Sequence, residues 1–197
     1  MKKELDLGKE KIGKLLLAFS VPCIISMIIN SIYNIVDQIF IGKGVGIIGN
    51  AANVIFPIVI ICNALAGLVG NGAAANLSLR LGEGKKDEAK KSIGSSITLL
   101  FIISILVVII FELLLPNLVY VFGCTKNVYS SAMTYGRIIV FGSFFMIIYS
   151  GLSQIIRADG SPKYSMICLL VGAILNIILD PILIFGLFGM PKLGIAG

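Results

Sequence analysis

Histidine and tryptophan are absent from this sequence, and charged residues are scarce. Of its 197 residues, none is His or Trp, and only 13% are Asp, Glu, Lys or Arg. The lack of His excludes catalytic triads with a His base and most zinc sites. Soluble domains carry roughly a quarter charged residues, so about half of the usual charge is missing. Since 57% of the residues are hydrophobic, one soluble core could not bury them, and we predict an integral membrane protein.

Cysteine usage and net charge exclude two further classes. The 4 Cys are far apart and form no CxxC motif, so we interpret them as small buried apolar residues rather than a metal or redox site. The formal net charge of +6 comes from basic residues that cluster between apolar runs. We therefore expect topology signals and contacts with the lipid bilayer, and no nucleic acid partner. The first apolar run is too long for a secretory signal peptide, so none is expected.

Long apolar runs dominate the rest of the sequence. About 20 apolar residues are needed to cross a bilayer as a helix. The runs of about that length or longer cover residues 15–41, 51–79, 93–115, 138–156 and 164–188. Gly42, Gly44 and Gly46 predict a turn after the first run, Pro116 is expected to end the third, and RADGSPK at 157–163 predicts a turn before the fifth. We therefore predict an all-α membrane protein with a bundle of five transmembrane helices.

The basic residues predict the orientation of these spans. Twelve of the 16 Lys and Arg residues lie in the amino tail, after the second run and after the fourth run. These three segments share one side of the membrane if every run crosses it. The positive-inside rule then places the amino terminus in the cytoplasm and the carboxyl end outside. We expect a multi-pass protein of the cell membrane.

An acidic residue in the first run belongs to a polar stripe. Asn30, Asn34 and Asp37 follow one another at helical spacing, and Ser26 and Tyr33 lie on neighbouring turns. Burying a charge in mid-membrane costs at least about 2.5–3.5 kcal/mol, so the stripe should face a bundle interior or a water-filled cavity rather than lipid. The other interpretation is that Asp37 lies near the outer end of its helix and only contacts headgroups.

A second acid lies in the fifth run, where Asn176 precedes Asp180 by one turn. Pro181 follows directly and has no N–H, so the carbonyl of Ile177 loses its helical hydrogen bond. A carboxylate, an amide oxygen and a freed carbonyl offer oxygen ligands, which suit a proton or a hard cation such as Na⁺. The alternative is a proline kink with a locally satisfied Asp. Two carboxylates in one low-dielectric cavity would repel, which favours a cation between them.

A third acid, Glu112, lies three residues before the end of its run and has no polar stripe beneath it. We interpret it as an interfacial residue. Gly67 and Gly70, together with Gly72 and the alanines at 73–75, are expected to permit close helix packing rather than to bind a phosphate, because no strand precedes them.

Several segments together resemble the multidrug and toxic compound extrusion (MATE) transporters. SVPCIISMIINSIYNIVDQIFIG resembles the first helix of that family, and GNGAAANLSLRLGEGKKDEA its junction between helices two and three. IIRADGSPKY resembles the loop between helices four and five. AILNIILDPILIFG and KLGIAG resemble helix five and the lead into helix six. The segments occur in the family's order over essentially the whole chain, which makes the resemblance far more specific than any one motif.

The resemblance implies a fold of twelve helices in two six-helix lobes around a central cavity. It implies export of cationic amphipathic drugs and dyes, driven by H⁺ or Na⁺ and without another cofactor. The family's cation site matches Asp37, Asn176 and Asp180. The expected substrate cavity is lined by four further residues: Asn30, Tyr33, Asn34 and Gln154. Residues 1–197 would form an incomplete amino-terminal lobe, with a missing carboxyl-terminal lobe needed for activity on small organic cations.

Three other functions are compatible with parts of this pattern. A flippase for lipid-linked oligosaccharides of the wider superfamily would have a strongly basic cavity, whereas the charges inside these spans are acidic. An intramembrane aspartyl protease would use two membrane Asp residues with Gly-rich flanks, but Leu179 and Pro181 flank Asp180. A non-transporting membrane fragment or interaction subunit is the third alternative.

Overall fold

The computed structural model describes residues 12–45 and 49–194. Within these ranges the chain forms helices and no strand. The elements are α1 (Ile12–Val45), α2 (Asn50–Gly82), α3 (Lys86–Val121), α4 (Tyr129–Ala158), α5 (Pro162–Phe185) and a 3₁₀ turn, η2 (Leu187–Gly189). Five of these helices are long and apolar enough to cross a membrane. The prediction of an all-α bundle of five spans is therefore confirmed.

Most of the helices extend beyond the apolar runs that predict them. The expectation that Pro116 ends the third helix is wrong, because α3 continues through it to Val121. Proline removes one backbone hydrogen bond, but in an apolar environment the other backbone groups can form hydrogen bonds only within the helix, so the helix continues. A turn at Gly42 and Gly44 is wrong as well, since α1 continues to Val45; Gly46 lies outside the described residues.

The turn expected in the RADGSPK segment is confirmed. The helix α4 ends at Ala158, and Gly160 has a φ of 80°, which only glycine adopts without strain. Pro162 then occupies the first turn of α5, where its missing N–H costs nothing. At its other end α5 stops at Phe185, three residues earlier than expected, because Gly186 takes the left-handed conformation with a φ of 72°.

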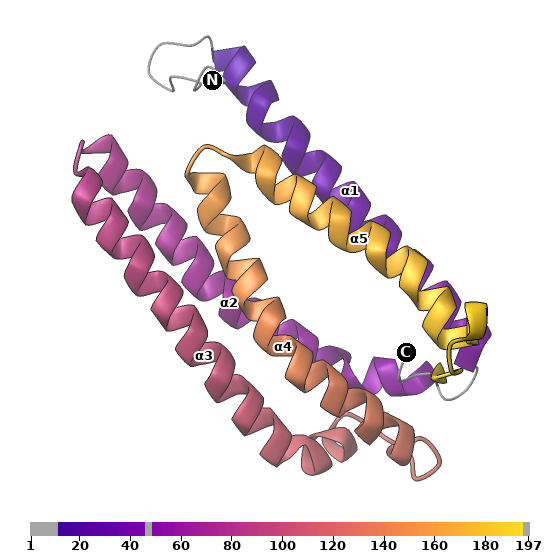
Figure 1. Ribbon diagram of the computed structural model, residues 1–197. Helices are drawn as coiled ribbons and strands as arrows, with labels where there is room; N and C mark the ends of the chain where they lie inside the picture. Colours follow the sequence, from indigo (N-terminus) through magenta and orange to yellow (C-terminus); the bar gives the residue numbers. More distant parts are fainter. Residues whose placement is uncertain (1–11, 46–48, 195–197) are drawn as a thin grey trace.

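The helices form two groups (Figure 1). The helices α2, α3 and α4 pack against one another, α1 packs along α5, and α4 makes a smaller contact with α5. The α2–α3 turn and the α4–α5 connection lie at one end of the molecule, and the α3–α4 connection lies at the other. The basic clusters after the second and fourth spans therefore share an end. Four basic residues of the amino tail, Lys2, Lys3, Lys9 and Lys11, lie outside the described residues.

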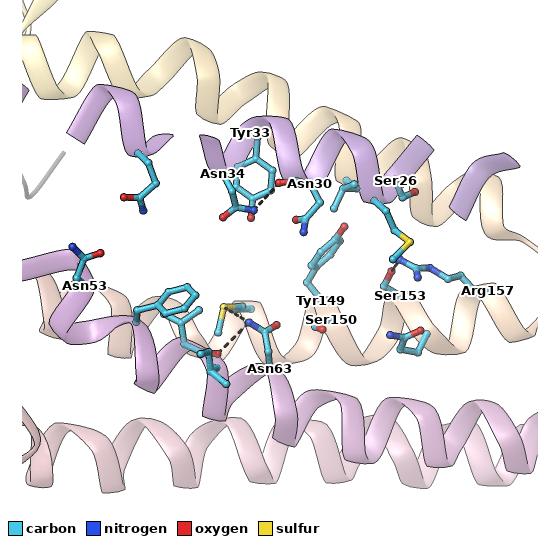
Figure 2. A pocket seen from close by; sticks show the side chains of 18 residues that line it. Ser26, Asn30, Tyr33, Asn34, Asn53, Asn63, Tyr149, Ser150, Ser153 and Arg157 are labelled. Atoms are coloured by element: carbon cyan, nitrogen blue, oxygen red, sulfur yellow. Dashed lines mark hydrogen bonds between the residues drawn. The ribbon is translucent and has the colours of Figure 1, made fainter. Parts of the chain in front are cut away.

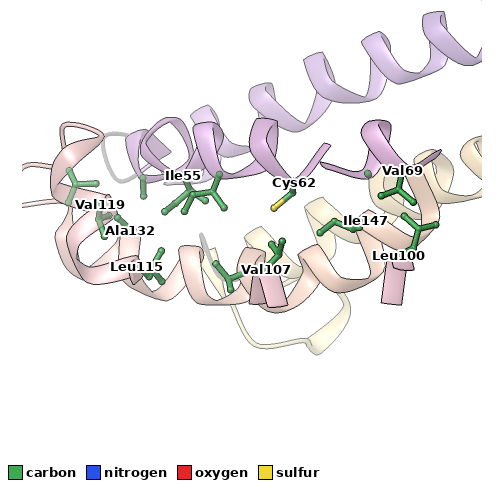
Figure 3. Packing of buried hydrophobic residues seen from close by; sticks show 14 residues of the cluster. Ile55, Cys62, Val69, Leu100, Val107, Leu115, Val119, Ala132 and Ile147 are labelled. Carbon is green, nitrogen blue, oxygen red and sulfur yellow. The ribbon is translucent and has the colours of Figure 1, made fainter. Parts of the chain in front are cut away.

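The hydrophobic core lies between α2, α3 and α4 (Figure 3). Ile55, Leu100, Leu115 and Ile147 are fully buried there, together with Cys62. The interpretation of the cysteines as buried is right for Cys62 and wrong for Cys168, which is exposed on α5. Cys62 and Cys168 both lie within long apolar runs, so the sequence pattern could not distinguish the buried cysteine from the exposed one.

Glycine sets the distance between α2 and α4. A Cβ atom on Gly70 would lie 2.9 Å from both the Cα and the carbonyl oxygen of Gly151. Gly70 therefore permits close helix packing, as expected. Gly67 meets only the side chain of Asn71, from its own helix. The expectation is wrong for Gly67 and for Gly72, because a Cβ atom at either position would meet no atom of another helix.

Candidate functional site

Asp37 of α1 and Asp180 of α5 lie together between the paired helices. Their carboxyl groups lie close enough to interact with each other. Asp180 is buried, with 8% of its surface exposed, and Asp37 is partly buried. Two ionised carboxylates in such a place would repel each other, and a proton or another cation would offset that repulsion. The pair is therefore a candidate site for a proton or another cation.

Asn176 supports this pair from the preceding turn of α5. Its Nδ2 donates a hydrogen bond of 2.9 Å to Oδ1 of Asp180. Its own Oδ1, and Oδ2 of Asp180, are buried without a hydrogen-bond partner. An unsatisfied buried acceptor costs about 1–3 kcal/mol. Two such oxygens beside a second carboxyl group are a donor set that suits a hard cation.

The backbone at this point differs from an unwound helix. Pro181 lies inside α5, which continues to Phe185. Pro181 still has no N–H for the carbonyl of Ile177. Two carboxyl groups and one amide provide few side-chain ligands, and the described part of the chain holds no group of three or more His, Cys, Asp or Glu residues that could bind a metal. A bound Na⁺ would therefore need backbone or water oxygens as well.

Tyr135 of α4, in the other helix group, lies near enough to the acid pair to sense its charge. It interacts electrostatically with both Asp37 and Asp180. The sequence pattern did not identify it, because Tyr135 lies in a mixed segment before the fourth apolar run. A single aromatic residue near the start of a helix belongs to no repeating polar pattern, so nothing in the sequence indicates that it lies at a site.

A polar cavity of about 930 Å³ lies beside α1 (Figure 2). All four residues expected to line a substrate cavity contribute to its wall: Asn30, Tyr33 and Asn34 from α1, and Gln154 from α4. The other lining residues are Ser26, Met27 and Gln38 of α1, Asn53, Phe56, Val59, Ile60 and Asn63 of α2, Met146, Tyr149, Ser150, Ser153 and Arg157 of α4, and Leu169 of α5.

The polar stripe of α1 is divided between the two sites. Asn30 and Asn34 line the cavity, but Asp37 does not. Asp37 lies about two turns beyond Asn30, at the level where Asp180 offers a partner on α5. Gln38, rotated by about 100° from Asp37, lines the cavity. The stripe is therefore shared between a helix–helix contact and a cavity, the two kinds of surroundings expected for it.

The cavity wall contains no acidic residue, and Arg157 is the one charged side chain among the residues that line it. The acidic residues inside the spans thus do not line this wall. Two amides provide negative dipoles instead. Asn34 and Asn63 donate their Nδ2 groups to the carbonyls of Asn30 and Val59, at 2.6 and 3.1 Å. Their amide oxygens remain as acceptors. A single basic residue also differs from the strongly basic cavity expected of a flippase.

Glu112 takes no part in either site. Its Oε1 pairs with Nε of Arg137 at 3.1 Å, which links α3 to α4. The interfacial position predicted for Glu112 stays a prediction, and the structure adds a partner on the neighbouring helix. The side chain of Arg137 is 61% exposed, so the pair lies at the edge of the bundle.

Comparison with known proteins identifies the class to which this arrangement belongs. The family model MatE matches residues 22–182. The chain belongs to the MatE family, and with its five apolar helices it is a multi-pass membrane protein.

Three individual matches support this assignment. The chain is 26% identical over 191 residues to the probable multidrug resistance protein YoeA of Bacillus subtilis, which covers 96% of this chain and 41% of YoeA. It is 33% identical over 185 residues to the multidrug export protein MepA of Staphylococcus aureus, covering 90% of this chain and 40% of MepA. A solved structure of the MATE multidrug transporter DinF-BH matches with a TM-score of 0.88 and 37% identity, covering 100% of this chain and 44% of that one.

These matches locate the chain within a longer architecture. It spans about two fifths of the length of the curated relatives that it matches, and it corresponds to the amino-terminal half of the solved transporters. The relatives are named as a multidrug resistance protein and a multidrug export protein. The two Asp residues lie close together, but the flanks of Asp180 lack the glycines that a membrane aspartyl protease would need.

Proposed function

We propose that this chain is the amino-terminal part of a cation-coupled antiporter of the cell membrane, with its amino terminus in the cytoplasm. H⁺ or Na⁺ would bind at Asp37 and Asp180, with Asn176 as a supporting ligand, and its inward flow would drive export of cationic amphipathic compounds. The observation that carries this proposal is the contact between the two carboxyl groups beside two unpartnered buried oxygens.

The position of α1 supports a coupling mechanism. This helix contributes Asp37 to the acid pair and Asn30, Tyr33 and Asn34 to the cavity wall. When a cation enters the pair, the repulsion between the carboxylates falls and the contact between α1 and α5 tightens. When it leaves, that contact weakens. Any bending or shift of α1 at its polar stripe then changes the cavity wall, so binding of cation and substrate become linked.

The cavity offers groups that suit the cationic part of a substrate. The amide oxygens of Asn34 and Asn63 carry partial negative charge, and Tyr33, Phe56 and Tyr149 provide aromatic rings. A ring face attracts a cation by about 0.5–2 kcal/mol, more when both are desolvated. The part of the relatives that this chain does not span would supply the opposite wall, and we propose that activity requires it.

Efflux of ethidium tests the proposal. The protein would be expressed from its complete gene in a bacterial host that lacks its own drug exporters. The Asp37→Asn variant should lose efflux while its amount in the membrane is unchanged. Asp159→Asn is the matched control, because this Asp lies in the exposed connection before α5. Unchanged efflux in Asp37→Asn would overturn the assignment of the cation site.

A further inference from the structure

Arg157 occupies one end of the polar cavity. Figure 2 shows it next to Ser153, with Asn53 and Asn34 farther along the space. It lies in the last turn of α4 and is partly buried. As the one charged group in the wall, it gives this end of the cavity a positive potential that the amide-lined remainder lacks.

Two buried serines hold the guanidinium group in place. Nε of Arg157 donates to Oγ of Ser165 at 3.0 Å, and Nη2 donates to Oγ of Ser153 at 3.3 Å. The two serine hydroxyls are also hydrogen-bonded to each other. Ser165 belongs to α5, so the cluster connects the two groups of helices. One edge of the guanidinium is therefore fixed by neutral partners.

The other edge of the guanidinium has no anionic partner. Within residues 12–45 and 49–194, no carboxylate forms an ion pair with Arg157, and Nη1 makes no hydrogen bond. A partly desolvated guanidinium without a counter-charge is unfavourable, and an anion that enters the cavity would offset this cost. A planar guanidinium fork is well matched to a carboxylate, with two parallel N–H···O bonds.

We propose that Arg157 is an anion subsite of the cavity, and that the protein favours amphiphiles carrying a carboxylate in addition to their cationic group. This inference rests on the proposed function, because it requires that the cavity binds the exported compound. The aromatic rings and amide oxygens would receive the cationic portion, while the carboxylate would contact Arg157. Preferred substrates would then be zwitterions.

A matched pair of dyes tests this subsite. A cationic rhodamine as its ethyl ester and the same rhodamine as the free acid differ by one carboxylate. Binding to the purified protein from the complete gene would be measured by fluorescence polarisation. The Arg157→Gln variant should weaken binding of the free acid roughly tenfold or more, which is typical of a lost charge-assisted pair. Binding of the ester should change less than twofold.

Arg137→Gln is the control variant, since this Arg lies on the same helix but outside the cavity wall. Equal losses for both dyes in Arg157→Gln would assign Arg157 a purely structural role, and no loss for either would exclude contact with the carboxylate. In the wild-type protein alone, the free acid should bind more tightly than the same cationic dye with its carboxylate converted to an uncharged amide. The reverse order would overturn the subsite even if the variant does not fold. Failure of wild type to bind any of the dyes would instead reject the proposed function.

Discussion

The carboxyl groups of Asp37 in α1 and Asp180 in α5 lie close enough to interact, although the two residues are far apart in the sequence. This contact lies between two helices that pack along each other. Near the same end of the two helices, Phe40 and Phe185 pack edge to face with their ring centroids 6.4 Å apart. The acid pair and this aromatic contact place the proposed cation site between two helices that are in contact along their length.

Replacing Asn176 should weaken the cation site without abolishing it. Asn176→Ala removes the 2.9 Å hydrogen bond to Asp180 and one unpartnered oxygen. A hydrogen bond to a charged group is typically worth about 1.5–3 kcal/mol. We therefore expect the concentration of the coupling ion that half-activates efflux to rise roughly tenfold, as measured at varied Na⁺ and at varied pH. Asn71→Ala, at an exposed amide on α2 outside the cavity wall, should leave it unchanged; an equal rise there would contradict the assignment.

Tyr135→Phe should alter ion dependence while preserving the fold. The ring remains for packing, but the hydroxyl group that interacts electrostatically with Asp37 and Asp180 is lost. We expect efflux to retain its maximum rate and to need a different concentration of coupling ion for half-activation. Tyr120→Phe is the control, because the ring of Tyr120 in α3 stacks on Tyr129 of α4, with the ring centroids 4.9 Å apart. Identical ion dependence in wild type and Tyr135→Phe would remove Tyr135 from the site.

Close packing of α2 and α4 should depend on Gly70. In Gly70→Ala, the new Cβ would lie 2.9 Å from the backbone of Gly151, and backbone atoms cannot move aside cheaply. Overpacking of this kind costs about 1–3 kcal/mol. The expected result is a lower melting temperature for the detergent-solubilised protein. Gly72→Ala is a sharp control, because a Cβ at Gly72 meets nothing within 4 Å. A melting temperature unaffected in Gly70→Ala would show that the two helices are farther apart.

Labelling of Cys124 tests the membrane orientation. This thiol lies in the α3–α4 connection, at the end opposite the α2–α3 turn. With the amino terminus in the cytoplasm, a membrane-impermeant maleimide added to whole cells should react with Cys124. Lys85→Cys, introduced with Cys124→Ser, should stay unlabelled until the cells are opened. The opposite pattern would invert the topology.

The rate of that labelling should depend steeply on pH. Burial raises the pKa of the Cys124 thiol above its ordinary value. Since only the thiolate reacts, a raised pKa means less thiolate at a given pH, and the rate should rise about tenfold per pH unit up to a higher pH than for a free thiol. Comparison with glutathione over pH 7 to about 9 measures this. If the labelling rate of Cys124 stopped rising at the same pH as that of glutathione, or at a lower pH, the result would contradict the burial of Cys124.

The sequence was sufficient for the spans and for the residues of the acid pair, for identifiable reasons. An uninterrupted apolar run has one favourable structure in a membrane, and a carboxylate within it is costly enough to stand out. Periodicity identified the face of α1 that carries Asn30, Asn34 and Asp37. It could not show that Asp37 contacts α5 while the two amides face the cavity, because that division depends on which helix lies opposite each turn.

Arg157 and Tyr135 illustrate what the sequence could not predict. Arg157 lies among loop residues and carries the charge typical of a topology signal, so nothing in the pattern places it in a cavity wall. Its location follows from the length of α4, which extends to Ala158. The helix end predicted at Pro116 was also wrong. A proline often ends a helix in a soluble protein, but α3 continues for five more residues.

Gradient-driven transport in proteoliposomes tests the central claim most directly. The purified protein from the complete gene would be reconstituted, and dye movement would be followed after imposing a pH gradient or a Na⁺ gradient. The wild-type protein should respond to one of these gradients. The Asp37→Asn/Asp180→Asn variant should bind the dye with similar affinity, because neither Asp lines the cavity, but should no longer respond to either gradient. Gradient-driven transport in this variant at the wild-type rate would contradict the account.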